Sequence, residues 1–266
     1  MTRPDRIYAA YVFDLDGTIY LGDELLPGAG RLVETLREHG AALRFVSNNP
    51  TRDPAQYAEK LGRLGLPTAV EDVVNTTVTM TRWLLDHHPD ALVFPIAEAP
   101  LKRALAKAGI RMSEDPQTID IVISSYDRGF DYRKLQIAFD AIRVHRRATL
   151  VATNPDRFCP LPGGRGEPDC AAITAAIEAC TATTCEKTVG KPDRAMLDAA
   201  LDGLDVDRGD CLVVGDRLAT DIRMGLDAGM PTALVLTGDT QREELDDLPS
   251  GEQPAFVVER IDALLP

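Results

Sequence analysis

The chain has 266 residues, of which 44% are hydrophobic, and its formal net charge at pH 7 is −13. That length suits one large α/β domain, or a core domain plus an insertion. The acidic balance disfavours nucleic acid as a partner because a duplex requires a basic surface. No run of about 18 apolar residues occurs, which argues against a membrane-spanning helix, and the N-terminal stretch lacks the features of a secretion signal. We therefore predict a cytoplasmic protein with no membrane partner.

The five cysteines are odd in number and form no CxxC pair. In a chain of this size they indicate reduced thiols and not a disulfide framework. A zinc site made by Cys170, Cys180 and Cys185 is a minor alternative, because no nearby His or paired cysteine supports it.

The first expected strand, Tyr11–Phe13, ends abruptly at the polar turn Asp14-Leu15-Asp16-Gly17-Thr18. A helix follows Gly30, with apolar residues at helical spacing up to Leu36. The next strand, Ala41–Val46, ends in Ser47-Asn48, and a second helix covers Pro54–Leu64. Alternating strands and helices of this kind indicate a parallel sheet.

From about Thr77 to Glu186 the sequence has an alternation of its own. The helices expected there are Val78–Asp86, Ala99–Ala108, Tyr132–His145 and Cys170–Cys180, and the strands are Ala91–Phe94, Ile119–Ser124 and Thr149–Ala152. The Pro- and Gly-rich segment Asn154–Pro168 is predicted to be loop. We expect a catalytic core of residues 1–76 and 187–266 with an inserted domain, 77–186.

The first pattern resumes near Lys191. A helix over Arg194–Leu201 has Asp193 as its expected N-cap. A strand over Asp210–Val214 then ends in Gly215-Asp216, and Asp221 falls on the first turn of the helix that follows. The fold class predicted is therefore α/β, with a doubly wound parallel sheet and an inserted α/β domain.

Polar side chains thus follow several strand or loop ends. They are Asp14, Asp16, Ser47, Asn48, Lys191, Asp216 and Asp221. Because a parallel sheet gathers its strand ends at one edge, these groups are expected to share a crevice. Carboxylates without His or Cys suit Mg²⁺ and not zinc, while a lysine and a hydroxyl suit an anion. The other interpretation is an ordinary Asp-Gly turn, a helix cap and a solvated lysine.

Phosphoryl transfer would need this whole set. A carboxylate that attacks a phosphate dianion from about 4 Å meets a repulsion of order 8 kcal/mol at an effective dielectric constant near 20. A divalent metal and a lysine together can offset that repulsion, whereas neither does so comfortably alone.

Four ordered motifs resemble those of haloacid dehalogenase (HAD) superfamily phosphatases. They are DxDGT at Asp14–Thr18, the strand-end Ser47, the lysine in VGKP at Lys191, and GDxxxxD at Gly215–Asp221. The segment ATNPD at Ala152–Asp156 is typical of subclass IIA, the NagD-like and pyridoxal-phosphate-phosphatase-like branch. The resemblance covers essentially the whole chain and implies a HAD-like Rossmannoid core with a C2-type cap. The stretch Gly166–Cys170 departs from several relatives, in a loop near the family's substrate.

The resemblance also implies roles. Asp14 would be the nucleophile that forms an aspartyl-phosphate, and Asp16 the general acid and base. Mg²⁺ would be held by Asp14, the Asp16 backbone carbonyl and Asp216, with Asp221 acting through water or by orienting Asp216.

The phosphoryl oxygens would be held by Ser47, Lys191 and backbone N–H groups near Asp16 and Asn48. Asn154 and Asp156 would contact the substrate, although Asn-Pro-Asp is also good turn chemistry.

The predicted function is Mg²⁺-dependent hydrolysis of a small phosphorylated metabolite. A sugar or polyol phosphate is favoured because the presumed specificity loop carries mostly charged groups and one aromatic residue, Phe158. The alternatives are a nucleotide or pyridoxal-phosphate phosphatase, dehalogenase or phosphonatase chemistry, and a catalytically idle binding module. A homodimer formed through the cap is a further expectation of the resemblance.

Overall fold

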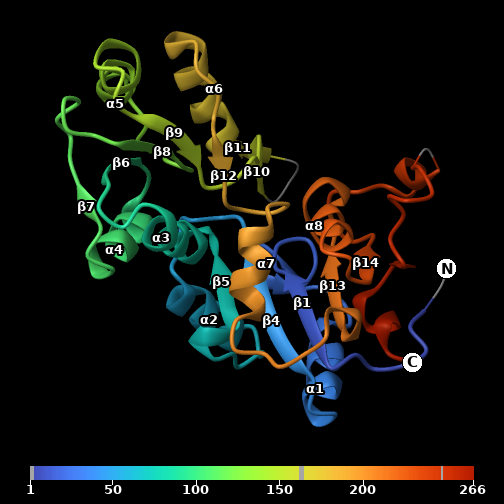
Figure 1. The fold of residues 1–266 in the computed structure, drawn as a ribbon. Coiled ribbons are helices and arrows are strands. Elements are labelled where there is room, and N and C mark those ends of the chain that lie inside the picture. Colours follow the sequence, from blue (N-terminus) through green and yellow to red (C-terminus); the bar gives the residue numbers. More distant parts are fainter. Residues whose placement is uncertain (1–2, 162–164, 247) are drawn as a thin grey trace. The chain divides into compact units, whose positions relative to one another are not determined.

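The computed structural model describes residues 3–161, 165–246 and 248–266. Its contacts divide the chain into two compact units (Figure 1). The first comprises Met1–Ser47, Pro54–Val74 and Lys191–Pro266, and the second comprises Asn48–Asp53 and Asn75–Gly190. The second unit is thus an insertion between two parts of the first.

The first unit is built on a six-stranded sheet in the order β15-β14-β13-β1-β4-β5. Its strands are β1 (Ala10–Asp14), β4 (Ala42–Ser47), β5 (Val73–Asn75), β13 (Cys211–Gly215), β14 (Thr232–Val235) and β15 (Phe256–Val258). Strand β1 pairs in parallel with β13 and β4, and β14 pairs in parallel with β13 and β15. The polar residues after β1, β4 and β13 therefore follow the same edge of the sheet.

Both faces of this sheet are buried, and the pleat of β1 shows how. Tyr11 and Phe13 point into a core cluster that also holds Leu32 and Leu36. Val12 is equally inaccessible but belongs to the opposite face, because successive side chains of a strand alternate. On β4, Arg44 donates from Nε to the carbonyl of Ala200 at 3.1 Å, which places α7 against that strand.

The helices of the first unit follow the expected pattern closely. They are α1 (Ala29–Glu38), α2 (Pro54–Arg63), α7 (Arg194–Leu201) and α8 (Arg223–Asp227), with short 3₁₀ turns at η1 (Val70–Asp72), η3 (Arg208–Asp210), η5 (Arg242–Leu245) and η6 (Ile261–Leu264). Asp193 caps α7 as predicted, accepting from the Ala195 N–H at 2.9 Å. The helix expected from Ala219 begins instead as a π-turn, η4 (Leu218–Ile222), and only then continues as α8.

The second unit has a five-stranded parallel sheet in the order β12-β9-β8-β6-β7. Its strands are β6 (Leu92–Ile96), β7 (Arg111–Met112), β8 (Ile121–Ser124), β9 (Thr149–Ala152) and β12 (Lys187–Thr188). Its helices are α3 (Thr76–His87), α4 (Ala99–Lys107), α5 (Tyr132–Phe139), continued by a π-turn at η2 (Asp140–Val144), and α6 (Cys170–Thr181). Phe94, Val122, Leu150 and Ile177 meet in its own hydrophobic core. The α/β fold with an inserted α/β unit is confirmed.

The prediction of loop throughout Asn154–Pro168 is wrong. Strands β10 (Phe158–Leu161) and β11 (Arg165–Pro168) pair in antiparallel register, with Phe158 opposite Pro168. A two-stranded ribbon has two edges and no central strand, so its prolines interrupt fewer hydrogen bonds than they would inside a sheet. The connecting residues 162–164 lie outside the described residues.

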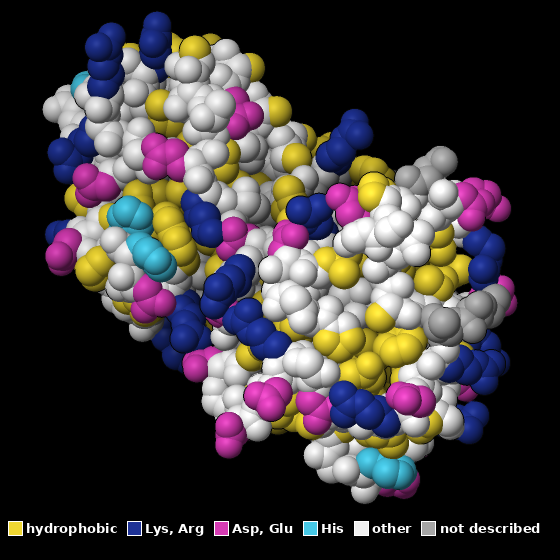
Figure 2. Space-filling view, turned by 45° about the vertical axis from the view of Figure 1, so that its right-hand side comes forward, with side chains coloured by type: hydrophobic (Ala, Val, Ile, Leu, Met, Phe, Trp, Pro, Cys, Tyr) yellow, Lys and Arg dark blue, Asp and Glu magenta, His cyan; other side chains and the backbone are white. Residues whose placement is uncertain are grey.

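A short hairpin after β1 was not anticipated. Strands β2 (Tyr20–Leu21) and β3 (Glu24–Leu25) form a small antiparallel hairpin directly after the DxDGT turn. All four histidines are exposed, and histidine side chains are visible at the surface in Figure 2. Within the part of the chain that the structure describes, no helix is both long and apolar enough to cross a membrane.

Candidate active site

Asp14 is the last residue of the central strand β1, and the chain turns immediately after it. The turn is closed by backbone bonds from Ile19 N–H and Tyr20 N–H to the carbonyl of Leu15, at 2.9 and 3.2 Å. Gly17 adopts a φ of 89°, in the left-handed region that favours glycine. Asp14 is buried, whereas Asp16 is exposed. The two aspartates of the motif therefore have different surroundings, as two different roles would require.

Three carboxylates meet at this edge of the sheet. Ligand oxygens of Asp14, Asp216 and Asp221 all lie within 4.8 Å of one another, and all three residues are buried. Asp216 directly follows β13, the parallel neighbour of β1, and Asp221 lies one helical turn further on. Among the described residues this is the one such cluster found, so the alternative zinc site of Cys170, Cys180 and Cys185 is not formed.

Lys191 provides the cation of the site. Its Nζ donates to Asp14 Oδ1 and, at 2.7 Å, to Asp221 Oδ1. The lysine side chain is almost fully buried. Burial by itself lowers the pKa of Lys191, but the charges of Asp14 and Asp221 outweigh that effect and raise it, so the ammonium form is held. The solvated-lysine interpretation is therefore wrong.

The pKa values of two of the carboxylates are raised, mainly by burial, which favours their neutral form. Burial raises the pKa of Asp14 well above its ordinary range; Lys191 opposes the rise and the charges of Asp221 and Asp216 add to it. Burial, followed by the charge of Asp221, raises the pKa of Asp216 to about 7. Three buried carboxylates around one ammonium leave an excess of negative charge that a further cation would neutralise.

The geometry fits a divalent metal at this position. Asp216 Oδ1 is buried and has no hydrogen-bond partner among the described residues, although a buried carboxylate oxygen normally has one. Oxygen-only ligands suit Mg²⁺. Asp14, Asp216 and Asp221 would hold the ion, whereas the Asp16 carboxylate lies outside the cluster and would contribute only its backbone carbonyl.

A loop that the sequence analysis did not single out supports Asp216. Asp239 N–H donates to Asp216 Oδ2 at 2.7 Å, and Thr237 Oγ1 donates to the Gly17 carbonyl at 2.6 Å. A Cβ atom on Gly238 would lie 1.9 Å from Asp216 Oδ2. The available signal was the Thr237-Gly238 pair at the end of β14, which neighbours β13 in the sheet.

Ser47 lies at the end of β4. Val46 is opposite Asp14 in the sheet register, so Ser47 is the next residue along the neighbouring strand. The buried Ser47 hydroxyl is 3.4 Å from the Tyr57 hydroxyl on α2. A side chain from the following helix thus orients Ser47, which the sequence pattern did not indicate.

The predicted substrate residues of the inserted unit have local structural partners. Asn154 is buried, donates from Nδ2 to the Asn48 carbonyl at 3.0 Å, and accepts from the Asp156 N–H at 3.0 Å. Thr76 Oγ1 donates to the same Asn48 carbonyl at 2.8 Å. These bonds join the Asn48 segment to the base of the β10–β11 hairpin within the second unit.

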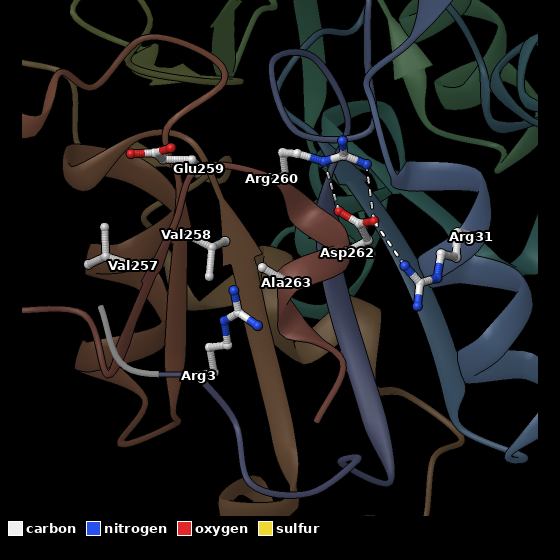
Figure 3. A pocket seen from close by; sticks show the side chains of 8 residues that line it. All are labelled: Arg3, Arg31, Val257, Val258, Glu259, Arg260, Asp262 and Ala263. Carbon is white, nitrogen blue, oxygen red and sulfur yellow. Dashed lines mark hydrogen bonds and ion pairs between the residues drawn. The ribbon is translucent and has the colours of Figure 1, made fainter.

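A pocket of about 360 Å³ lies elsewhere in the first unit, at edge strand β15. Figure 3 shows that Arg260 and Arg31 point toward Asp262 there, and Arg260 binds both oxygens of that carboxylate at 3.1 Å. Strands β14 and β13 separate β15 from β1, and no residue that lines the pocket belongs to the acidic cluster. The pocket is therefore not the candidate active site.

A parallel sheet with a buried aspartate at the end of strand β1, and an acidic cluster beside a buried lysine, is the arrangement of a class of hydrolases. The family model for haloacid dehalogenase-like hydrolases matches residues 11–111, and a second model, for HAD-hydrolase-like proteins, matches residues 188–264. The chain belongs to this family. Within it, the chain is a member of the NagD-like phosphatases of subclass IIA, as the sequence motifs predicted.

Named relatives cover nearly the whole chain. An acid sugar phosphatase of Staphylococcus haemolyticus is 34% identical over 94% of this chain and 92% of its own. The 5'-nucleotidase YutF of Bacillus subtilis is 32% identical over 98% of this chain and 99% of its own. The structure of a 4-nitrophenylphosphatase from Thermotoga maritima aligns with a TM-score of 0.89 at 31% identity, covering 97% of this chain and 96% of that one. The prediction of a phosphatase is confirmed.

The stability of the metal-free protein should depend on Asp216. With its pKa raised from 3.8 to about 7, folded Asp216 keeps a proton that the unfolded chain releases, so the free energy of unfolding should fall between pH 4 and 7, by on the order of 4 kcal/mol. The stability advantage of Asp216→Asn over wild type should therefore be larger at pH 8 than at pH 5, by on the order of 3 kcal/mol. Urea unfolding in EDTA at both pH values measures this, and a variant effect that is equal at pH 5 and pH 8 would contradict it.

The close approach of Gly238 to Asp216 gives a second test. Gly238→Ala should displace the Asp216 carboxylate and weaken Mg²⁺ binding by about tenfold to a hundredfold, as expected for residues that support metal ligands. Gly30→Ala is the matched control, because a Cβ there meets nothing within 4 Å. Calorimetric titration measures the Mg²⁺ affinity. An unchanged affinity in Gly238→Ala would show that the close approach of Gly238 to Asp216 is not needed for metal binding.

Proposed function

We propose that the protein hydrolyses the phosphate monoester of a small metabolite through an aspartyl-phosphate on Asp14. The observation that carries this proposal is the buried cluster in which Lys191 pairs with Asp14 and Asp221 beside Asp216. An ammonium and three carboxylates held together out of water have little purpose in a structural core, where such charges are unfavourable. They suit the transfer of an anionic phosphoryl group.

The chain's own residues supply the two chemical steps. An Asp14 oxygen attacks phosphorus, the bond from phosphorus to the leaving oxygen breaks, and Asp16 gives its proton to that oxygen. Asp16 then takes a proton from water, whose oxygen attacks the same phosphorus, and inorganic phosphate and the Asp14 carboxylate are released. Ser47 and Lys191 hold the phosphoryl oxygens. Mg²⁺ bound by Asp14, Asp216 and Asp221 would reduce the repulsion between the nucleophile and the phosphate.

The first test is Asp14→Asn, which removes the nucleophilic charge with little change of shape. We expect the variant to fold and its turnover of 4-nitrophenyl phosphate to fall by a factor of at least about 10⁴, since a covalent step is lost.

In the wild type, EDTA should abolish phosphate release, and Mg²⁺ should restore it better than Ca²⁺, whose larger and looser shell misplaces the ligands. Activity of Asp14→Asn within tenfold of wild type would exclude Asp14 as the nucleophile, and full activity in EDTA would exclude the metal.

The same assay separates the other readings. Dehalogenase chemistry would need no Mg²⁺ and would release halide and not phosphate. An idle binding module would release neither, while retaining Mg²⁺ binding at the acidic cluster.

For the substrate, we infer a sugar or polyol phosphate, with the inserted unit as the cap that selects it. The β10–β11 hairpin offers the exposed side chains of Arg157 and Arg165, and Glu167 accepts a hydrogen bond from the Tyr126 hydroxyl. Charged and polar groups of this kind suit the hydroxyls of a sugar. Asp169 is less available than the sequence suggested, because it is buried as the N-cap of α6.

A nucleotide is the second candidate, because Phe158 on β10 is 49% exposed and an exposed ring can stack on a base. The named relatives include both an acid sugar phosphatase and a 5'-nucleotidase. A homodimer through the inserted unit also stays a prediction, which light scattering can check.

A substrate panel distinguishes the two candidates. We expect kcat/KM to be higher for glycerol phosphate and for hexose and pentose phosphates than for UMP, AMP or pyridoxal phosphate. Phe158→Ala should change kcat/KM for the sugar phosphates by less than about threefold, since their binding does not depend on a single stacking ring. A preference of more than about tenfold for a nucleotide or for pyridoxal phosphate, lost in Phe158→Ala, would establish the second candidate instead.

A further inference from the structure

Lys60 is a buried lysine that the proposed chemistry does not use. It lies on α2 and is 5% exposed, and its Nζ is 3.5 Å from the centroid of the Tyr20 ring. A buried ammonium needs a compensating partner, and the negative face of an aromatic ring is one. Lys60 therefore places a positive charge directly against Tyr20.

Tyr20 in turn contacts a residue of the active site. Its ring is fully buried, and its hydroxyl donates to Asp16 Oδ2 at 3.4 Å. The backbone fixes this pairing, because Gly17 N–H donates to the Tyr20 carbonyl at 2.9 Å and Asp16 and Tyr20 form a β-bridge. Tyr20 is thus held next to an otherwise exposed Asp16 carboxylate.

We propose that Tyr20, with Lys60 against its ring, is a positioning residue for proton transfer by Asp16. The Tyr20 hydroxyl is hydrogen-bonded to Asp16 Oδ2. Asp16 Oδ1 is then the oxygen that carries the proton to the leaving group. This inference rests on the proposed phosphatase function, in which Asp16 is the general acid. At 3.4 Å the hydrogen bond is long, and such catalytic bonds commonly shorten when substrate binds.

Lys60 strengthens the effect through the ring. A cation over the ring face draws electron density from the phenol oxygen, and the O–H becomes a better hydrogen-bond donor to a carboxylate. Helix α2 also carries Tyr57, three residues earlier and on the same face, whose hydroxyl meets Ser47. One helix face thus reaches both a phosphoryl-binding residue and, through Tyr20, the proton donor.

The experiment uses the dependence of rate on the leaving group. An alkyl alcohol leaves poorly unless it is protonated, whereas a dinitrophenol leaves readily as an anion. Tyr20→Phe should therefore lower kcat/KM for glycerol phosphate by at least about tenfold and for 2,4-dinitrophenyl phosphate by less than about threefold, because kcat/KM includes departure of the leaving group. A purely structural role of Tyr20 would lower both values equally.

Two tyrosine variants serve as matched controls. Tyr8 also has a cation over its ring, Arg6 at 4.6 Å, but it lies before β1, at the opposite end of that strand from Asp14. Tyr8→Phe should therefore leave kcat/KM unchanged for both substrates. Tyr57→Phe should lower kcat/KM for both substrates by the same factor, because Ser47 binds the phosphoryl group that the two substrates share. Lys60→Met, which keeps an apolar stem, should repeat the selective loss of Tyr20→Phe to a smaller degree.

The outcomes are distinct. A selective loss with glycerol phosphate in Tyr20→Phe supports the inference even where Lys60→Met fails to fold. An equal loss with both substrates, or no loss, overturns it while leaving the phosphatase function intact. If the wild type releases no phosphate from either substrate with Mg²⁺, the proposed function itself fails and this inference with it.

Discussion

The ion triad of Lys191 with Asp14 and Asp221 is the constraint on which the rest of the site depends. Charges this deeply buried are unfavourable unless each has a partner of opposite sign. One ammonium cannot balance three carboxylates, which is why burial and mutual repulsion raise the pKa values of Asp14 and Asp216. The folded protein therefore has an excess of negative charge at this site, and binding of a metal ion would neutralise it.

The fold maintains this unfavourable cluster by rigid geometry. Parallel pairing of β1 with β4 and β13 fixes the strand ends side by side, and the surrounding loops approach so closely that Gly17 and Gly238 have no room for a side chain. Hydrogen bonds from Asp239 and Thr237 complete the support. The repulsion between these like charges is thus offset by backbone packing and by the apolar core that Tyr11 and Phe13 enter.

The division of labour between the two units has a physical basis. The first unit contains every residue of the acidic cluster together with Lys191, Tyr20 and Lys60. The second has its own sheet and hydrophobic core, and it carries the hairpin with the exposed Phe158. Because the acidic cluster and Lys191 lie within one unit, the other unit can vary its surface groups without disturbing them.

The sequence by itself determined the parallel α/β fold, the inserted unit and the acidic cluster, because strand-end motifs at Asp14, Lys191 and Asp216 must converge once the sheet is parallel. It could not determine contacts that local patterns do not encode. The β10–β11 hairpin was hidden by its prolines and glycines, which resemble loop until the pairing partner is known. The Asp239 bond to Asp216, the Tyr57 contact with Ser47, and the Lys60–Tyr20–Asp16 series join residues whose side chains meet only after packing. Tertiary structure alone decided these, because a side chain's partner depends on the three-dimensional course of the backbone and not on spacing along the chain.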